Sequence, residues 1–193
     1  TGVKNVIVGA SAGVALAGGA NNTAVGYEAL STEDGHGNST AIGYRALKTQ
    51  NAGAESYNVA VGVDAGLSIT TGIDNTLVGS GAGDALTNAD YNVAVGRNAL
   101  GSDTLGSMSV AIGNGALTTQ NFTTATNTYN IGIGQGAGSS ITTGIQNTLI
   151  GGLAGDSLNV GSTNVAVGTS ALGADTKGNS SVAIGSSALR LQN

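Results

Sequence analysis

The sequence predicts an all-β fold, a parallel β-solenoid in which the chain winds into eleven stacked coils of about 17 residues. Three observations predict it. A glycine-centred motif recurs at nearly constant spacing, the residue before each of these glycines is always Val or Ile, and the composition opposes a helix. Glycine accounts for 34 of the 193 residues, and the segments between glycines are rich in Asn, Thr and Val, which are poor helix formers.

The motif consists of Asn or Ser, three mostly apolar residues, Gly, two variable residues and Ala. Each copy predicts one short strand that ends at the glycine and is followed by turns. Eleven coils stacked at ~4.8 Å would form a rod on the order of 50 Å long. The motif glycines recur at one constant interval, except for two longer intervals that follow Gly43 and Gly113, and they are Gly9, Gly26, Gly43, Gly62, Gly79, Gly96, Gly113, Gly134, Gly151, Gly168 and Gly185.

Two faces of each strand can be distinguished by residue type. The residues one and three before the glycine share one face and are Val, Ile or Thr, which favours a buried, pleated surface. On the other face, the residue two before the glycine varies in size with the residue four after it, so that Leu77 occurs with Gly83, whereas Ala occurs with Leu. We interpret this as volume compensation in one core. Two copies combine two small residues, and there we expect Ile69 and Ile141 to fill the gap.

A longer period of about 72 residues lies on top of the coil period, since SITTGIDNTLVG (68–79) returns as SITTGIQNTLIG (140–151). Four coils therefore form one block, and each block closes with an enlarged loop, 49–57 or 119–129. We predict a single repetitive shaft over 1–193, with blocks of about 1–57, 58–129 and 130–193. Both ends match positions inside the repeat, which leads us to expect a segment of a longer fibre or a chain that stacks end to end.

Stacking places equivalent residues of neighbouring coils in columns. Asn heads most copies, and we expect the stacked amides to form a hydrogen-bonded column. Glu28, Arg45 and Asp64 occupy one position on three successive coils, and their alternating sign avoids repulsion between neighbours.

The charge content restricts the partners. Only 9% of the residues are charged and the formal net charge is −5. We therefore expect no nucleic-acid partner, because phosphate binding requires clustered Lys and Arg. We also expect no membrane insertion, because no apolar run approaches the ~20 residues that span a bilayer. A surface this neutral favours a second copy of the chain as a partner.

Several copies of the motif resemble those of known surface proteins. SVAIGNGAL (109–117) and SVAIGSSAL (181–189) resemble the repeats of YadA-like head domains in trimeric autotransporter adhesins, and NTAVGYEAL (22–30) resembles repeats of bacteriophage tail fibres. The resemblance covers almost the whole chain. It implies a left-handed parallel β-roll, a homotrimer with three chains side by side, an extracellular location on a cell surface or virion, and a role in gripping a cell. Adhesin and tail fibre both remain open.

One polar cluster invites a catalytic interpretation. Glu33, Asp34 and His36, the only histidine, lie together in STEDGHGNS (31–39), and a carboxylate with a histidine could act as acid and base. However, the matching turns carry Asp103 and Asp175 in place of Glu33, and glycine in place of His36. We therefore interpret the cluster as a turn and predict no catalytic residue.

No cofactor or metal is expected either. The glycine-rich runs at 78–83 and 131–138 lack the spacing of a phosphate-binding loop, and the repeat already explains their glycines. Asp84 and Asp156 follow glycines, but they lie a whole block apart, whereas calcium-binding β-rolls repeat every nine residues.

Aromatic residues are the candidate surface contacts, because an exposed tyrosine offers both an apolar face and a hydroxyl to a glycan or a protein. They are Tyr27, Tyr44, Tyr57, Tyr91, Phe122 and Tyr129.

The predicted function is thus that of a structural fibre with an attachment role rather than an enzyme. Two alternatives compete with it. A polysaccharide-cleaving enzyme of the tailspike β-helix type would need two inward carboxylates ~5 to 10 Å apart in a groove. An ice-binding solenoid would need threonines on successive coils, whereas the pairs Thr70–Thr71 and Thr142–Thr143 are a whole block apart.

Overall fold

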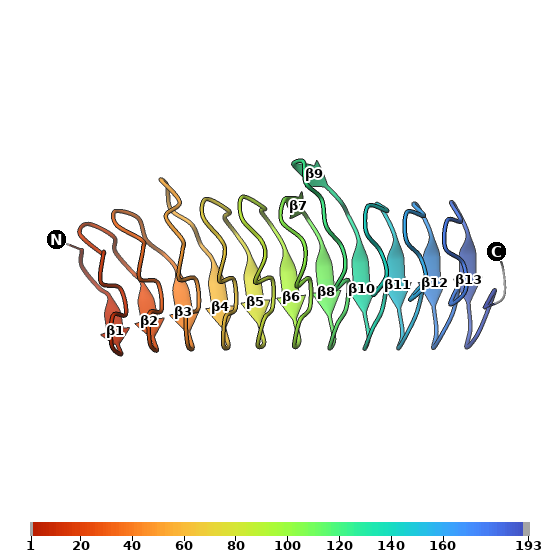
Figure 1. Ribbon diagram of the computed structural model, residues 1–193, viewed down its shortest axis with the longest axis horizontal. Coiled ribbons are helices and arrows are strands. Elements are labelled where there is room, and N and C mark those ends of the chain that lie inside the picture. The colour runs from red at the N-terminus through yellow and green to blue at the C-terminus, as the bar shows by residue number, and fades with distance from the viewer. Residues whose placement is uncertain (1, 191–193) are drawn as a thin grey trace.

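The computed structural model describes residues 2–190 and confirms the predicted β-solenoid. Eleven parallel strands form one sheet, in which each strand pairs with that of the next coil, and the coils follow one another along a rod with β1 and β13 at opposite ends (Figure 1). The described residues contain no helix, and therefore none able to cross a bilayer. The strands of this sheet are β1 (Val6–Val8), β2 (Thr23–Val25), β3 (Thr40–Ile42), β4 (Val59–Val61), β5 (Thr76–Val78), β6 (Val93–Val95), β8 (Val110–Ile112), β10 (Ile131–Ile133), β11 (Thr148–Ile150), β12 (Val165–Val167) and β13 (Val182–Ile184).

The enlarged loops leave the strand register unchanged. Thr40 of β3 pairs with Val59 of β4 across the longer coil, and Val110 of β8 pairs with Ile131 of β10, at the same motif positions as in the shorter coils. The additional residues are accommodated away from the strands. In the second loop, β9 (Thr126–Asn127) pairs with β7 (Gly106–Ser107) in a small separate sheet that projects from the rod (Figure 1).

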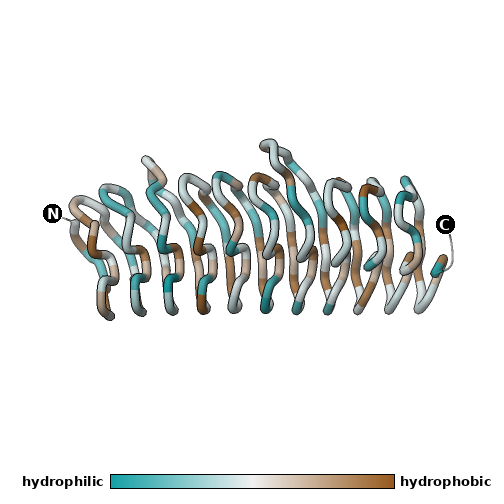
Figure 2. The backbone as a smooth tube through the Cα atoms, viewed as in Figure 1, coloured by the Kyte–Doolittle hydropathy of each residue, from teal (hydrophilic) through white to brown (hydrophobic). Residues whose placement is uncertain are grey.

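The core is a narrow column inside the coils. It is built from the middle residues of the strands from β2 onward, such as Leu77, the alanine three residues after the motif glycine and large residues of the turns, such as Leu100. Apolar residues accordingly recur at matching levels in successive coils (Figure 2). The volume compensation is confirmed, because a Cβ placed on Gly83 would lie 2.8 Å from Leu77 Cδ2.

In two coils both of the compensating core positions carry a small residue, Ala60 with Gly66 and Gly132 with Gly138. The space beside these residues is filled mainly by side chains of adjacent coils. A Cβ on Gly66 would approach Leu77 Cδ1 to 2.8 Å and Leu47 Cδ2 to 2.9 Å, and both leucines belong to adjacent coils. Ile69 contributes as predicted, at 3.2 Å. Ile141 takes the equivalent place beside Gly138, also at 3.2 Å.

The outer residues of the strands correct one expectation. The sequence favours burial of the β-branched residues one and three before the motif glycine, yet none of those in the described strands is buried in the single chain. They point away from the core, because the middle residue of each strand already occupies the inside of the coil. The outer face of the sheet has no cover from the described part of the chain.

The motif glycine sets how closely coils can stack. Gly96 has φ +134°, and a Cβ there would lie 2.5 Å from the carbonyl oxygen of Gly113 on the next coil. Only glycine avoids this contact while holding a backbone conformation that other residues rarely adopt.

The predicted asparagine column is confirmed, with a bonding pattern richer than amide stacking. The backbone N–H of Asn75 donates to Asn58 Oδ1 at 2.8 Å, and Asn75 Oδ1 accepts from the backbone N–H of Asn92 at 3.0 Å. The Asn58 Nδ2 group donates to the carbonyl of Gly72 on the following coil at 2.7 Å. Each buried amide thus satisfies backbone groups of neighbouring coils, which are costly to leave unpaired.

A buried polar cluster lies where serine interrupts the asparagine column. Gln120, from the second enlarged loop, donates through Nε2 to Asp103 Oδ2 at 2.6 Å and to Ser109 Oγ at 2.8 Å. Its Oε1 accepts from Asn130 Nδ2 at 2.8 Å. The first enlarged loop repeats the arrangement, with Gln50 in the place of Gln120. The glutamine bridges the gap left by the shorter serine.

We expect Gly96→Ala to destabilise the rod by about 2 to 5 kcal/mol, because the new Cβ combines backbone strain with a steric clash. Gly152→Ala is the matched control, since a Cβ there meets no atom within 4 Å and the φ of Gly152 is not positive. Urea unfolding followed by circular dichroism would measure both. Equal stability of the two variants would contradict the role given to the motif glycine.

Gln120→Leu should cost about 2 to 4 kcal/mol, because it leaves the Asp103 carboxylate and the Asn130 amide with one buried partner fewer each. The exposed Gln135 provides the control, and Gln135→Leu should change stability by less than about 0.5 kcal/mol. Thermal unfolding of the two variants beside the unchanged protein would test this, and a neutral Gln120→Leu would show that the buried cluster is dispensable.

Candidate functional site

The outer face of the sheet is a chemically uniform surface that runs along the described part of the rod. We call it the outer sheet face and define it as the first and third residues of the eleven strands of the large sheet. Every one of these residues is β-branched, four being Thr and the others Val or Ile, and none is charged. In the interior coils they are half-buried or just exposed, for instance Val78 at 36% and Ile112 at 37%. Regular pairing holds them in two straight parallel ranks.

The outer sheet face is about as large as the largest apolar patch on a typical monomer. Eleven strands at ~4.8 Å and a strand length of about 10 Å give a strip of roughly 500 Å². The largest apolar patch on a typical monomer covers roughly 300 to 600 Å², and patches of this size are often sites of association.

Two of the predicted surface tyrosines form a stack at the edge of the coils. The rings of Tyr27 and Tyr44 have centroids 5.5 Å apart and are inclined by 14°, and both side chains are nearly half exposed. The Arg45 guanidinium lies 4.9 Å from the centroid of the Tyr44 ring. The stack follows from register, because the tyrosines directly follow the motif glycines of neighbouring coils.

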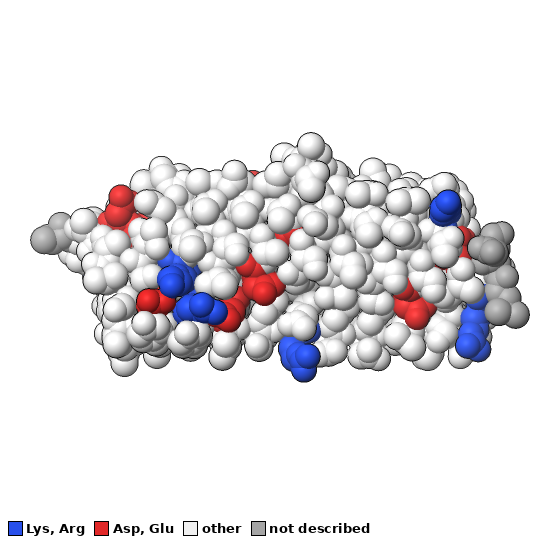
Figure 3. Space-filling model, in the orientation of Figure 1, with Lys and Arg blue, Asp and Glu red and all other residues white. Residues whose placement is uncertain are grey.

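Charged residues beside this stack pair along the rod axis. Arg45 binds Asp64 with two hydrogen bonds of 2.8 and 2.9 Å, whereas Glu28 pairs with Lys48 at 2.6 Å. The hydrogen bond from Lys48 lowers the pKa of Glu28, and the bond to Asp64 raises the pKa of Arg45. The predicted alternation of charge is therefore realised, with Lys48 rather than Arg45 as the direct partner of Glu28. Elsewhere on the visible face, charges are few and separate (Figure 3).

The remaining aromatic candidates divide into two kinds. Tyr57, Tyr91 and Tyr129 are exposed at 54, 52 and 52%, as a contact role requires. Phe122 is only 7% exposed, so its assignment as a surface contact is wrong. Its backbone N–H donates to the buried Asp103 carboxylate at 2.9 Å, which holds this part of the loop against the coil.

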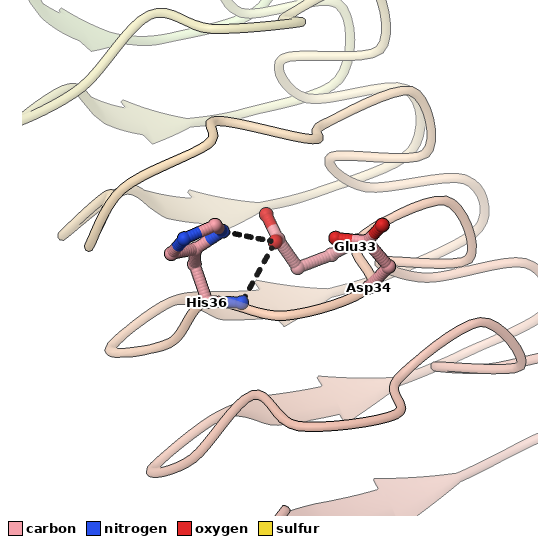
Figure 4. Close-up of side chains that lie close together, drawn as sticks. All are labelled: Glu33, Asp34 and His36. Carbon is pink, nitrogen blue, oxygen red and sulfur yellow. Dashed lines mark hydrogen bonds and ion pairs between the residues drawn. The ribbon is translucent and has the colours of Figure 1, made fainter.

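The cluster around His36 is arranged as a turn (Figure 4). Glu33 is fully buried, and its Oε1 accepts the backbone N–H of His36 at 3.2 Å while its Oε2 accepts from Gln50 at 3.1 Å. Asp103 holds the N–H of Gly106 in the same way, at 3.1 Å, and Asp175 holds that of Gly178. The turns that carry Glu33, Asp103 and Asp175 thus share one carboxylate-to-backbone bond, which agrees with the interpretation of the cluster as a turn.

This turn also contains a group of three side chains, among residues 2–190, with the donor types of a metal site. One atom each of Glu33, Asp34 and His36 lies within 4.8 Å of the others, and His36 Nδ1 is 3.7 Å from Glu33 Oε1. Both Glu33 oxygens already accept hydrogen bonds, so binding a cation would compete with the contacts that hold the turn. The carboxylates considered for calcium, Asp84 and Asp156, are half-buried, and burial raises the pKa of both.

Sequence reasoning missed the outer sheet face and the buried clusters around Gln50 and Gln120. A signal for the clusters was present, since serine replaces asparagine at every fourth motif and a glutamine occupies the same place in both enlarged loops. Comparison of the chain with models of protein families, with curated proteins and with solved structures finds no match.

The turn interpretation leads us to expect that His36→Gly changes the free energy of unfolding by less than about 0.5 kcal/mol, whereas Glu33→Ala costs about 1 to 3 kcal/mol through loss of buried hydrogen bonds. Thermal unfolding measures both. Zinc chloride provides the counter-test: a rise in Tm on adding zinc that His36→Gly abolishes would contradict a purely structural turn.

Proposed function

We propose that the chain is the shaft of an extracellular attachment fibre, in which three copies associate through their outer sheet faces. The observation that carries the proposal is the uncharged, wholly β-branched composition of that face along its entire length. An apolar strip of this size is costly to leave in water, and a second copy offers a strip with the same coil spacing. The fibre role rests on the rod shape, and the trimer and the left-handed winding rest on the resemblance to adhesin and tail-fibre repeats.

Polysaccharide cleavage receives less support. Three buried carboxylates accept backbone hydrogen bonds in equivalent turns, and they are Glu33, Asp103 and Asp175. Each lies four coils from the next, which corresponds to roughly 19 Å. Glycoside hydrolysis uses pairs about 5 to 10 Å apart. Each of these carboxylates also accepts hydrogen bonds from the backbone of its own turn.

Ice binding is likewise the weaker alternative. Thr residues do point outward on the sheet, at Thr23, Thr40, Thr76 and Thr148, but only the first two lie on neighbouring coils. The rest of that rank is Val or Ile, which favours contact with another apolar face over ordered water.

The proposal predicts that the protein sediments at three times its chain mass of 18.5 kDa. We expect Val95→Lys combined with Ile133→Lys to remain folded and to dissociate, because two charges would be buried without partners in the assembled face. Gln135→Lys with Thr169→Lys adds the same charge at exposed turn positions and should leave the mass unchanged. A stable folded monomer of the unchanged protein at low concentration would refute the proposal.

A further inference from the structure

Three of the five tyrosines occupy one column of the rod, which we call the tyrosine line: Tyr57, Tyr91 and Tyr129. Each directly precedes the buried asparagine that heads its strand. Backbone bonds keep this column in register, since the N–H of Tyr91 donates to the carbonyl of Ile73 at 3.1 Å, and that of Met108 to the carbonyl of Asp90 at 3.0 Å. Tyrosine therefore recurs on alternate coils, with Asp74 and Met108 between, at a spacing of roughly 9.5 Å.

The fold does not require tyrosine in this column. Tyr57, Tyr91 and Tyr129 have φ of 51°, 60° and 51°, a left-handed conformation that is uncommon for bulky residues and suits asparagine far better. Asn21 and Asn38 adopt the same conformation in this column at 59° and 62°. Residues as different as Met108, Gln146 and Thr163 hold the same conformation in this column, so the backbone accepts many side chains here and does not dictate the recurrence of tyrosine.

The side chains themselves are available. All three tyrosines are more than half exposed, whereas Asp74 and Met108 between them are half-buried, so that the rings stand above their neighbours in the column. The line thus offers three raised, equally spaced rings along about 19 Å of the rod axis. Each ring combines an apolar face with a polar hydroxyl, as sugar rings require.

We propose that the tyrosine line binds an extended, neutral, β-1,4-linked polysaccharide parallel to the rod axis. In such a chain successive sugars are rotated by half a turn, so that every second sugar presents the same face, and two sugars advance by close to the spacing of two coils. The single charge within the line, Asp74, can accept a hydrogen bond from a sugar hydroxyl and disfavours an anionic chain. This inference rests on the proposed attachment role and names the class of ligand to which the fibre would attach.

Binding can be measured by isothermal titration calorimetry, whose signal does not depend on the tyrosines that the variants remove. We expect chitohexaose or cellohexaose to bind, the corresponding disaccharides to bind at least tenfold more weakly, and maltohexaose, whose α-linked chain curves, to bind at least tenfold more weakly than the β-linked hexamers. The triple variant Tyr57→Asn, Tyr91→Asn, Tyr129→Asn should lose binding at least tenfold while its Tm stays the same or rises, because asparagine suits the left-handed conformation. The control Tyr27→Ser, at an exposed tyrosine outside the line, should bind normally.

Sedimentation of the triple variant separates this inference from the proposed assembly. An unchanged mass together with lost binding supports the tyrosine line as a glycan site, whatever that mass is. Dissociation of the triple variant would overturn the inference, because the tyrosines would then belong to the contact between chains. Equal binding of maltohexaose, or binding that survives in the triple variant, would overturn it as well.

Discussion

The close approach of successive coils at the motif glycines is the constraint on which the rest of this structure depends. At Gly96 the distance left for a Cβ is 2.5 Å, less than any side chain tolerates, so a coil that is followed by another can lie at sheet spacing only if it keeps its motif glycine. Once this spacing is held, the strands pair in register, the asparagine amides reach the next coil, and equivalent side chains form columns. The surface properties of the rod are consequences of those columns.

The same geometry explains why the chain leaves one face uncovered. A three-residue strand points one side chain inward, and that residue with its alanine and leucine partners already fills the inside of the coil. The two outward residues then have no second layer from the described part of their own chain. Their β-branched character suits the pleated surface, and it is also what makes the face apolar. The three-residue strand therefore explains both features: its middle residue belongs to a narrow core, and its first and third residues form a broad apolar exterior.

Much of the fold could be predicted from the sequence because a repeat multiplies a weak local signal. Coil number, strand position, the pairing of Leu77 with Gly83 and the structural role of Glu33 all follow from comparing copies. Exposure of the other strand face could not be predicted, because both faces are apolar, and volume compensation identifies one buried face without excluding burial of the second. The inward packing of Phe122 escaped prediction for a related reason: its counterpart in the first enlarged loop is Ala52, which has no ring to indicate where an aromatic side chain would lie.

The enlarged loops have a consequence for how such a rod can diversify. The coils that contain them, between Gly43 and Gly62 and between Gly113 and Gly134, are longer than all the others, yet the strands on either side pair as if nothing had been added. Length at this corner is therefore uncoupled from the rest of the lattice. As long as the buried glutamine, Gln50 or Gln120, keeps its contacts, residues can be added to the rest of the loop, and the rod can acquire new projecting surfaces while its scaffold stays the same.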